Sequence, residues 1–85
     1  MGGGAAEKEG VAVPRKLREL RRDLRRDGWY IDRQKGSHQT WRHPLLKGAR
    51  VTLAGADGAD AQDYQEDDVR DGVRLAQAAR KGQKP

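Results

Sequence analysis

The sequence predicts an α+β fold with the order αβββα, in which a three-stranded antiparallel sheet carries two helices on one face. Three observations predict this class. Leucines at spacings of three and four residues indicate an amphipathic helix over residues 14–27. Three short segments over 29–34, 38–43 and 50–54 have the alternation or β-branched residues of strands. A second amphipathic segment over 66–80 follows, and stacking both helices on the sheet buries the apolar faces.

The first helix is expected to begin at Pro14, because the first turn of a helix tolerates the missing N–H of proline. Leu17, Leu20 and Leu24 form its apolar stripe. Gly28 can adopt the left-handed conformation that closes a helix, so the helix should end at Asp27. Arginines are expected to cover the other faces: Arg18, Arg21, Arg22, Arg25 and Arg26.

The strand segments alternate in their side chains. Trp29 and Ile31 should face one side of the sheet, and Tyr30 and Asp32 the other. A turn is predicted at Lys35-Gly36-Ser37 and a second connection over residues 45–49. The predicted core draws on all the elements: Leu17, Leu20, Leu24, Trp29, Ile31, Trp41, Val51, Leu53, Val69 and Val73.

An acidic loop over 55–63 precedes the second helix. Tyr64 is expected to act as a hydrophobic staple at the helix start, and Glu66 to complement the helix dipole. Val69, Val73 and Ala76 form the apolar stripe of this helix. Gly72 lies inside it and is expected to weaken it by about 1 kcal/mol relative to alanine.

The length of 85 residues predicts one small domain. We expect a disordered lead-in over 1–12, a domain over 13–81 and a frayed tail over 82–85. The chain contains no cysteine, which excludes disulfides and thiolate metal sites. No apolar run is long enough to span a membrane and no secretory signal is evident, so the expected location is the cytoplasm and no membrane partner is expected.

Positive charge is concentrated in one part of the chain. Residues 11–50 contain twelve Lys and Arg against four Asp and Glu, whereas residues 51–85 contain five against seven. A basic half attracts polyanions such as RNA or DNA. For the helix arginines alone, a solvated face that keeps the protein soluble is an equally good interpretation.

His38 follows the predicted turn, and strand alternation predicts where it points. Trp41 is the large apolar residue of the second strand and should face the core, which places Gln39 and His43 on the same side. His38 and Arg42 then lie on the open side of the sheet. The alternative is a purely structural role, in which Gly36 makes a turn, Ser37 caps it, and His38 is an ordinary exposed residue. His43 precedes a proline at a strand end, where a structural role is common.

An exposed histidine among cations suits RNA cleavage. Histidine titrates near neutrality and can take the 2′-OH proton or protonate the leaving 5′-oxygen. Lys35, with Arg33 or Arg42, could hold the phosphate. Ser37 and the N–H of Gly36 could donate hydrogen bonds to phosphate oxygens. The sequence shows no credible spacing of metal ligands, no phosphate-binding glycine loop and no nucleophile elbow, so we expect neither a metal nor another cofactor.

These residues also carry a resemblance to a known family. Asp27-Gly28-Trp29-Tyr30, the run from Arg33 to His38, then Trp41, His43-Pro44 and Arg50-Val51-Thr52 resemble the HicA toxins. The resemblance covers about residues 15–54. From Gly55 onward the chain departs from the family pattern, because a longer acidic loop precedes Val69.

The resemblance implies a fold like that of double-stranded-RNA-binding domains and the activity of an mRNA interferase of a type II toxin–antitoxin system. It implies that His38 is the catalytic residue, that mRNA is the substrate, and that a HicB-like antitoxin is the partner. Two other functions stay open. One is a non-catalytic RNA-binding module on the same scaffold, which would contact 2′-OH and phosphate groups. The other is a basic interaction domain that docks an acidic protein.

Overall fold

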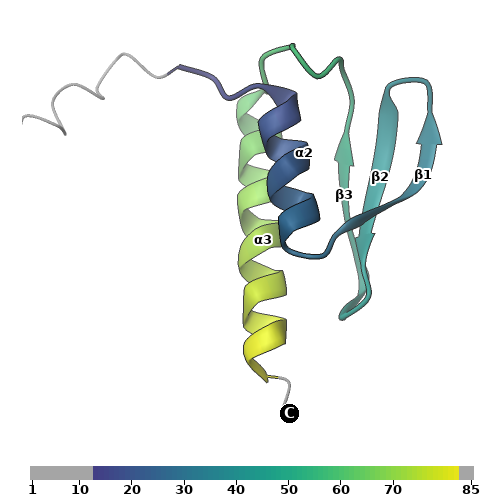
Figure 1. The fold of residues 1–85 in the computed structure, drawn as a ribbon, viewed down its shortest axis with the longest axis vertical. Helices are drawn as coiled ribbons and strands as arrows, with labels where there is room; N and C mark the ends of the chain where they lie inside the picture. The colour runs from purple at the N-terminus through teal and green to yellow at the C-terminus, as the bar shows by residue number, and fades with distance from the viewer. Residues whose placement is uncertain (1–12, 83–85) are drawn as a thin grey trace, which may run out of the picture.

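The structure is a computed structural model that describes residues 13–82. The predicted order of helix, three strands and helix is confirmed (Figure 1). The expectations for the lead-in over 1–12 and for residues 83–85 of the tail lie outside the described residues. The elements are α2 (Leu17–Arg26), β1 (Tyr30–Lys35), β2 (His38–His43), β3 (Leu46–Leu53) and α3 (Asp63–Gly82).

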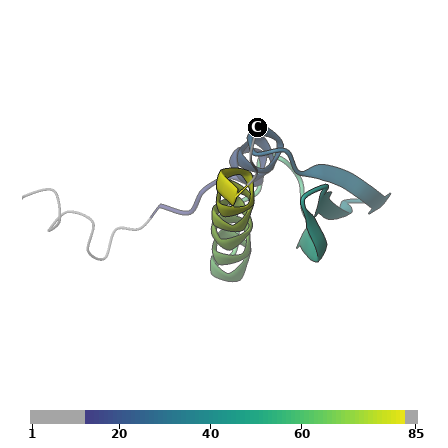
Figure 2. The same cartoon turned by 90° about the horizontal axis from the view of Figure 1, so that it is seen from below.

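The three strands form one antiparallel sheet in the order β1-β2-β3. Both helices pack on the same face of this sheet, as predicted (Figures 1 and 2). The β1–β2 hairpin extends away from the helices, and five of the six residues of β1 are exposed. The architecture is α+β and consistent with a double-stranded-RNA-binding-domain fold, and it leaves one sheet face open.

Helix α2 ends in a Schellman motif, close to the predicted position. Its last helical residue is Arg26, and Gly28 takes a φ of +96°. The N–H of Trp29 donates to the carbonyl of Leu24 at 3.0 Å, and that of Gly28 donates to Arg25 at 3.1 Å. These are the two backbone hydrogen bonds that define the motif, and they require the positive φ that glycine adopts without strain.

The start of α2 differs from the prediction, because the helix begins at Leu17 rather than at Pro14. Carbonyls of the acidic loop accept its first N–H groups: Leu17 donates to Ala59 at 2.9 Å and Arg18 to Asp57 at 3.0 Å. The N–H of Ala61 donates in turn to the carbonyl of Arg15 at 2.7 Å. No side chain caps the start of α2, and the backbone carbonyls of the loop take this role.

Helix α3 begins at Asp63, earlier than predicted, and the expected role of Tyr64 is wrong. Tyr64 lies inside the helix and is 62% exposed. The cap comes from Gln65, whose Oε1 accepts a hydrogen bond from the N–H of Gln62 at 2.8 Å. This is the reaching-back half of a capping box, and it satisfies a donor at the helix start.

Strand β3 is longer than predicted. The connection expected over 45–49 is a turn at Pro44 and Leu45 alone, and β3 already begins at Leu46. The pairing of β2 with β3 is irregular between Arg42 and His43, whose partners are Arg50 and Leu46. The intervening residues include Gly48, whose φ of +82° distorts the strand without ending it.

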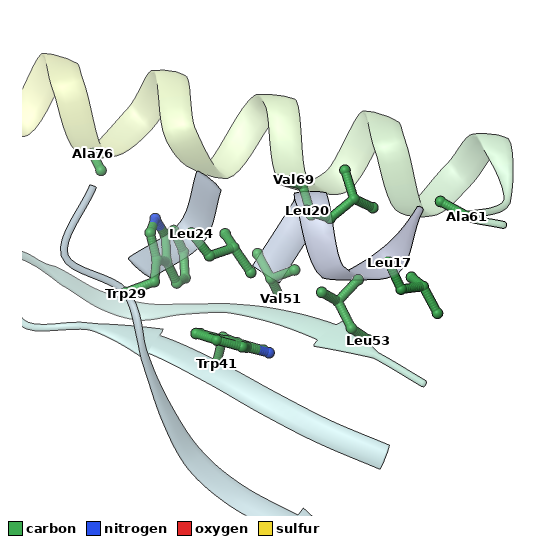
Figure 3. Packing of buried hydrophobic residues seen from close by; sticks show 10 residues of the cluster. All are labelled: Leu17, Leu20, Leu24, Trp29, Trp41, Val51, Leu53, Ala61, Val69 and Ala76. Carbon is green, nitrogen blue, oxygen red and sulfur yellow. The ribbon is translucent and has the colours of Figure 1, made fainter. Parts of the chain in front are cut away.

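The core lies between the two helices and strands β2 and β3 (Figure 3). Eight of the ten predicted core residues are buried, and the other two, Ile31 and Val73, are only partly buried beside the cluster. Ala61 and Ala76 complete the core.

Gly72 lies where α3 approaches the sheet closely. A Cβ added to Gly72 would lie 3.0 Å from the ring of Trp29 and 3.2 Å from the side chain of Val51. The glycine that weakens α3 locally therefore lets this helix contact the sheet.

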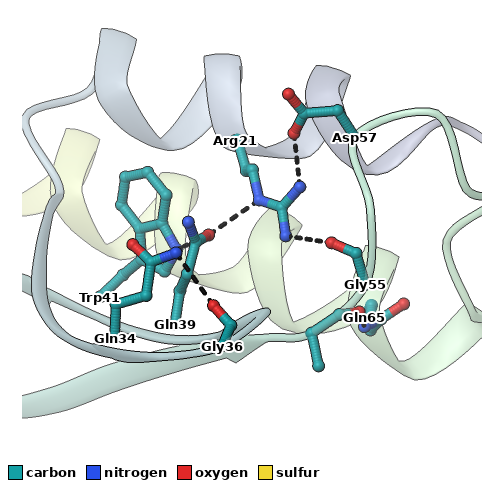
Figure 4. Close-up of polar contacts among 9 residues, drawn as sticks. Arg21, Gln34, Gly36, Gln39, Trp41, Gly55, Asp57 and Gln65 are labelled. Atoms are coloured by element: carbon teal, nitrogen blue, oxygen red, sulfur yellow. Dashed lines mark hydrogen bonds and ion pairs between the residues drawn. The ribbon is translucent and has the colours of Figure 1, made fainter.

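Arg21 contradicts the expectation that the arginines of the first helix cover its outer faces. It is buried, and its guanidinium joins three parts of the fold (Figure 4). It donates to Oε1 of Gln39 at 2.8 Å, to the carbonyl of Gly55 at 2.7 Å and to the carboxylate of Asp57 at 2.5 Å. Arg21 is thus a structural link between α2, β2 and the acidic loop.

Candidate functional site

A bulge in β1 determines which of its side chains reach the open face. Ile31 pairs with Trp41, whereas Arg33 pairs with Thr40, so Asp32 is an extra residue between two pairs. Strict alternation from Ile31 would turn Arg33 and Lys35 toward the helices. The bulge reverses this, because residues paired across antiparallel strands share a face.

The sheet face opposite the helices, which we call the open face, is strongly basic. The cations Arg33, Lys35, Arg42 and Arg50 form no ion pair within residues 13–82. Their partners and the buried residues between them place eight side chains on this face: Tyr30, Arg33, Lys35, His38, Thr40, Arg42, Arg50 and Thr52.

His38 lies at the tip of this face and is exposed, as strand parity predicts. It pairs directly with Lys35 across the hairpin, so the imidazole and the ammonium share the open face. The turn between them is Gly36-Ser37, and Gly36 takes a φ of +59°. A positive φ at the first position of a two-residue turn is typical of the tight hairpins that match strand twist.

The turn itself is oriented by a side chain of β1. Nε2 of Gln34 donates to the carbonyl of Gly36 at 3.1 Å (Figure 4). Gly36 and Ser37 are both exposed, and a Cβ on Gly36 would contact nothing within 4 Å. The space around the turn is therefore open to a ligand that approaches His38.

The structure separates the two arginines that the sequence associated with the histidine. Arg33 lies near the tip, since it precedes Lys35 by two residues on the same face. Arg42 lies four residues along β2 from His38, which is about 13 Å in an extended strand. Lys35, Gly36, Ser37, His38 and Arg33 thus form one cluster, and Arg42 belongs to the other end of the open face.

His43 is a structural residue. It is buried, and its Nδ1 accepts a hydrogen bond from the N–H of Leu45 at 3.1 Å. Because an amide can only donate, Nε2 carries the proton and donates it to the carbonyl of Asp27 at 2.7 Å. The ring also packs edge-on against Trp29, with centroids 5.5 Å apart. The sequence motif therefore divides into a buried clasp around His43 and an exposed tip around His38.

Sequence reasoning missed Arg50 as a residue of the site and gave no role to Tyr30. The available signal was the parity of β3, because Arg50 precedes the core residue Val51 and must face away from it. Arg25 is a further exposed cation, with its guanidinium 5.1 Å from the centre of the Trp41 ring.

Within residues 13–82, no group of three or more His, Asp and Glu side chains is arranged to hold a metal ion. In the same part of the chain, neither helix has the length and apolar character needed to cross a bilayer.

The fold and the open face define a small basic α+β protein with one accessible histidine. A family model described as the HicA toxin of bacterial toxin–antitoxin systems matches residues 17–78, so the chain belongs to the HicA toxin family. The match extends into α3 as far as residue 78, beyond the residues 15–54 on which the sequence resemblance rests. No curated protein and no solved structure gave a significant match.

Membership places the chain among the toxins of type II toxin–antitoxin systems, a family of mRNA interferases. It also implies an antitoxin as partner.

Proposed function

We propose that this chain is an endoribonuclease that cleaves mRNA without a metal ion and uses His38 for proton transfer. The observation that carries the proposal is the exposed imidazole paired with Lys35 at the tip of the basic open face. A histidine in this place fills no space and makes no structural hydrogen bond within residues 13–82, in contrast to the buried His43.

The reaction that these groups suit is transfer of the phosphodiester to the neighbouring ribose hydroxyl. His38 takes the proton of the 2′-OH, and the 2′-oxygen forms a bond to phosphorus. The bond from phosphorus to the 5′-oxygen breaks, and the 5′-oxygen takes up a proton from water or from the His38 imidazolium formed when the 2′-OH proton was taken. The products are a 2′,3′-cyclic phosphate and a 5′-hydroxyl end.

The residues around His38 stabilise the charge that develops. The phosphorane-like transition state carries more negative charge than the bound phosphodiester. The ammonium of Lys35 and the guanidinium of Arg33 are placed to neutralise it, and Ser37 and the N–H of Gly36 supply donors at the turn. Arg42 contacts the RNA further along the face.

The proposed partner is a HicB-like antitoxin that covers the open face and thereby blocks His38. A cover of this kind would shield a basic surface, so an acidic contact region on the antitoxin suits it.

The growth of a bacterial host that expresses the chain tests the proposed nuclease function in living cells. We expect expression of the native chain to arrest growth and to deplete full-length mRNA, and expression of His38→Ala to do neither. Immunoblotting verifies equal protein levels. An exposed position on α3, Gln77→Ala, is the control and should arrest growth like the native chain. Arrest by the His38→Ala chain at the same protein level would contradict the assignment of the catalytic residue.

The basic face supports a second candidate, a non-catalytic RNA-binding module. Four cations that form no ion pair within residues 13–82 lie on this face, and they suffice for phosphate binding. If this candidate is right, the native and His38→Ala chains both bind RNA and neither shortens it.

A further inference from the structure

The strand register aligns three side chains in one row across the open face, at the end remote from the Gly36-Ser37 turn. Tyr30 pairs with Arg42, and Arg42 pairs with Arg50. The adjacent row contains Trp41 and Val51, which are buried beneath the helices. Tyr30, Arg42 and Arg50 therefore point to the open side. We call these three residues the aromatic–arginine row.

Two arginines directly opposite each other are unfavourable in the unliganded protein. Directly paired residues hold their Cβ atoms about 5 Å apart, and like charges there repel. Within residues 13–82 neither Arg42 nor Arg50 has a carboxylate in ion-pair distance. At the edge of the sheet, Arg50 also lines a groove of about 220 Å³ with Asp68 and Asp71 of α3, and in the described part of the chain neither carboxylate forms an ion pair with it. An anion placed between the two guanidinium groups would relieve the repulsion.

Tyr30 adds a different kind of contact to this row. It is 48% exposed, so its ring is accessible to a ligand on the open face. An exposed aromatic ring beside cations stacks on an unpaired base while the cations hold the backbone. A base inside a duplex is already stacked and offers no free face.

We propose that Tyr30, Arg42 and Arg50 form a nucleotide subsite that stacks one unpaired base and binds its phosphate, so that the protein selects single-stranded RNA. The subsite lies about 13 Å along β2 from His38, a span that a few nucleotides of an extended strand cover. This inference deepens the proposed function and rests on it for the direction in which RNA crosses the face. Binding through the row can nevertheless be measured without cleavage.

The test uses fluorescence anisotropy in the His38→Ala background, which prevents cleavage. The probe is a short fluorescein-labelled RNA of mixed sequence, either single-stranded or annealed to its complement. We expect tighter binding of the single strand. Tyr30→Ala should weaken single-strand binding about tenfold and leave duplex binding unchanged. Tyr30→Trp should retain the affinity, and RNA should quench the fluorescence of the new exposed indole.

The two arginines are tested through the salt dependence of binding. Arg42→Gln and Arg50→Gln should each reduce the slope of log affinity against log salt by about 0.7, the value for one phosphate contact on a single strand. The controls are Tyr64→Ala and Lys81→Gln, which remove an exposed ring and a charge from α3 and should bind like the parent chain. Circular dichroism verifies that each variant is folded.

Two outcomes would overturn the subsite: Tyr30→Ala binding the single strand as well as the parent does, or losing single-strand and duplex binding equally. These outcomes are separable from the failure of the proposed function. If the native chain cleaves RNA through His38 while the row variants bind like the parent, the subsite is wrong and the nuclease stands. If the row variants behave as expected and the native chain does not cleave, the nuclease is wrong and the subsite stands.

Discussion

Gly28 and His43 show how single residues position the site from beneath. A Cβ on Gly28 would lie 2.9 Å from Nε2 of His43, the atom that donates to the carbonyl of Asp27. The carboxylate of Asp27 accepts from Arg80 at 2.6 Å. This clasp joins the end of α2 to the end of β2 and to α3. The buried residues of the motif therefore fix the position of the sheet relative to the helices, although they do not lie on the open face.

Gly28→Ala is expected to reduce the free energy of unfolding by about 2 kcal/mol or more. Part of the loss comes from the left-handed conformation, which costs a residue with a side chain roughly 1–2 kcal/mol, and part from the contact with His43. The matched control is Gly48→Ala, since Gly48 also has a positive φ but no atom within 4 Å of its added Cβ. Urea denaturation measures both. Equal losses in the two variants would show that the contact with His43 is unimportant.

At the scale of single residues, the alternation of side chains along the strands was the sequence signal that predicted which residues are exposed. It predicted the exposure of His38, and it placed Trp41 and His43 on the buried side. It could not predict the bulge at Asp32, because a bulge depends on the pairing of two strands and leaves no period in either of them. The catalytic role of His38 stays a prediction until it is measured.

At the scale of elements, the acidic loop and α2 stabilise each other. Loop carbonyls cap the helix, Asp60 pairs with Lys16 at 2.6 Å, and Arg21 reaches the loop from the helix interior. The sequence indicated an acidic loop but not its role at the start of α2, because capping by backbone carbonyls carries no residue-type signal. The helical period did carry a signal for Arg21, which follows Leu17 by four residues and precedes Leu24 by three, so it is the arginine of α2 nearest the apolar stripe.

Arg21→Met is expected to lower the free energy of unfolding by about 2–4 kcal/mol. The substitution leaves the carbonyl of Gly55 and the amide of Gln39 without their charged donor in a buried region. The control is Arg22→Met on the exposed side of α2, where we expect a change of about 0.5 kcal/mol or less. Asp57 itself is 70% exposed, so removing only its carboxylate should matter little. Thermal or urea denaturation of Arg21→Met, Arg22→Met and a variant without the Asp57 carboxylate measures these changes in stability. Similar losses for Arg21→Met and Arg22→Met would refute the structural link.

At the scale of the whole molecule, the helices occupy one face of the sheet, and the strand cations Arg33, Lys35, Arg42 and Arg50 occupy the other. The ion pairs of the helices and the loop neutralise many of their own charges, for example Arg15 with Asp23 at 2.8 Å and Arg80 with Asp27. Hydrogen bonding to Asp23 raises the pKa of Arg15 above its ordinary value. Within residues 13–82, cations that form no ion pair remain on the strands and also on the exposed side of α2, where they include Arg18, Arg22 and Arg25. Both sets are available to a polyanion.

The fold class and the order of the elements could be predicted because they follow from local periodicity and from the need to bury three apolar faces. The extent of β3 and the start of α3 could not be predicted from the sequence. Both depend on tertiary contacts, the pairing of Leu46 with His43 and the cap that Gln65 provides.

The most direct test of the central claim is the rate of RNA cleavage by the purified chain and by His38→Ala, both in excess EDTA. We predict that the native chain cleaves, leaving 2′,3′-cyclic phosphate and 5′-hydroxyl ends, and that His38→Ala is slower by about 10²–10⁴-fold with unchanged circular dichroism. Cleavage by His38→Ala at the native rate, or native activity that disappears in EDTA and returns with Mg²⁺, would contradict the account.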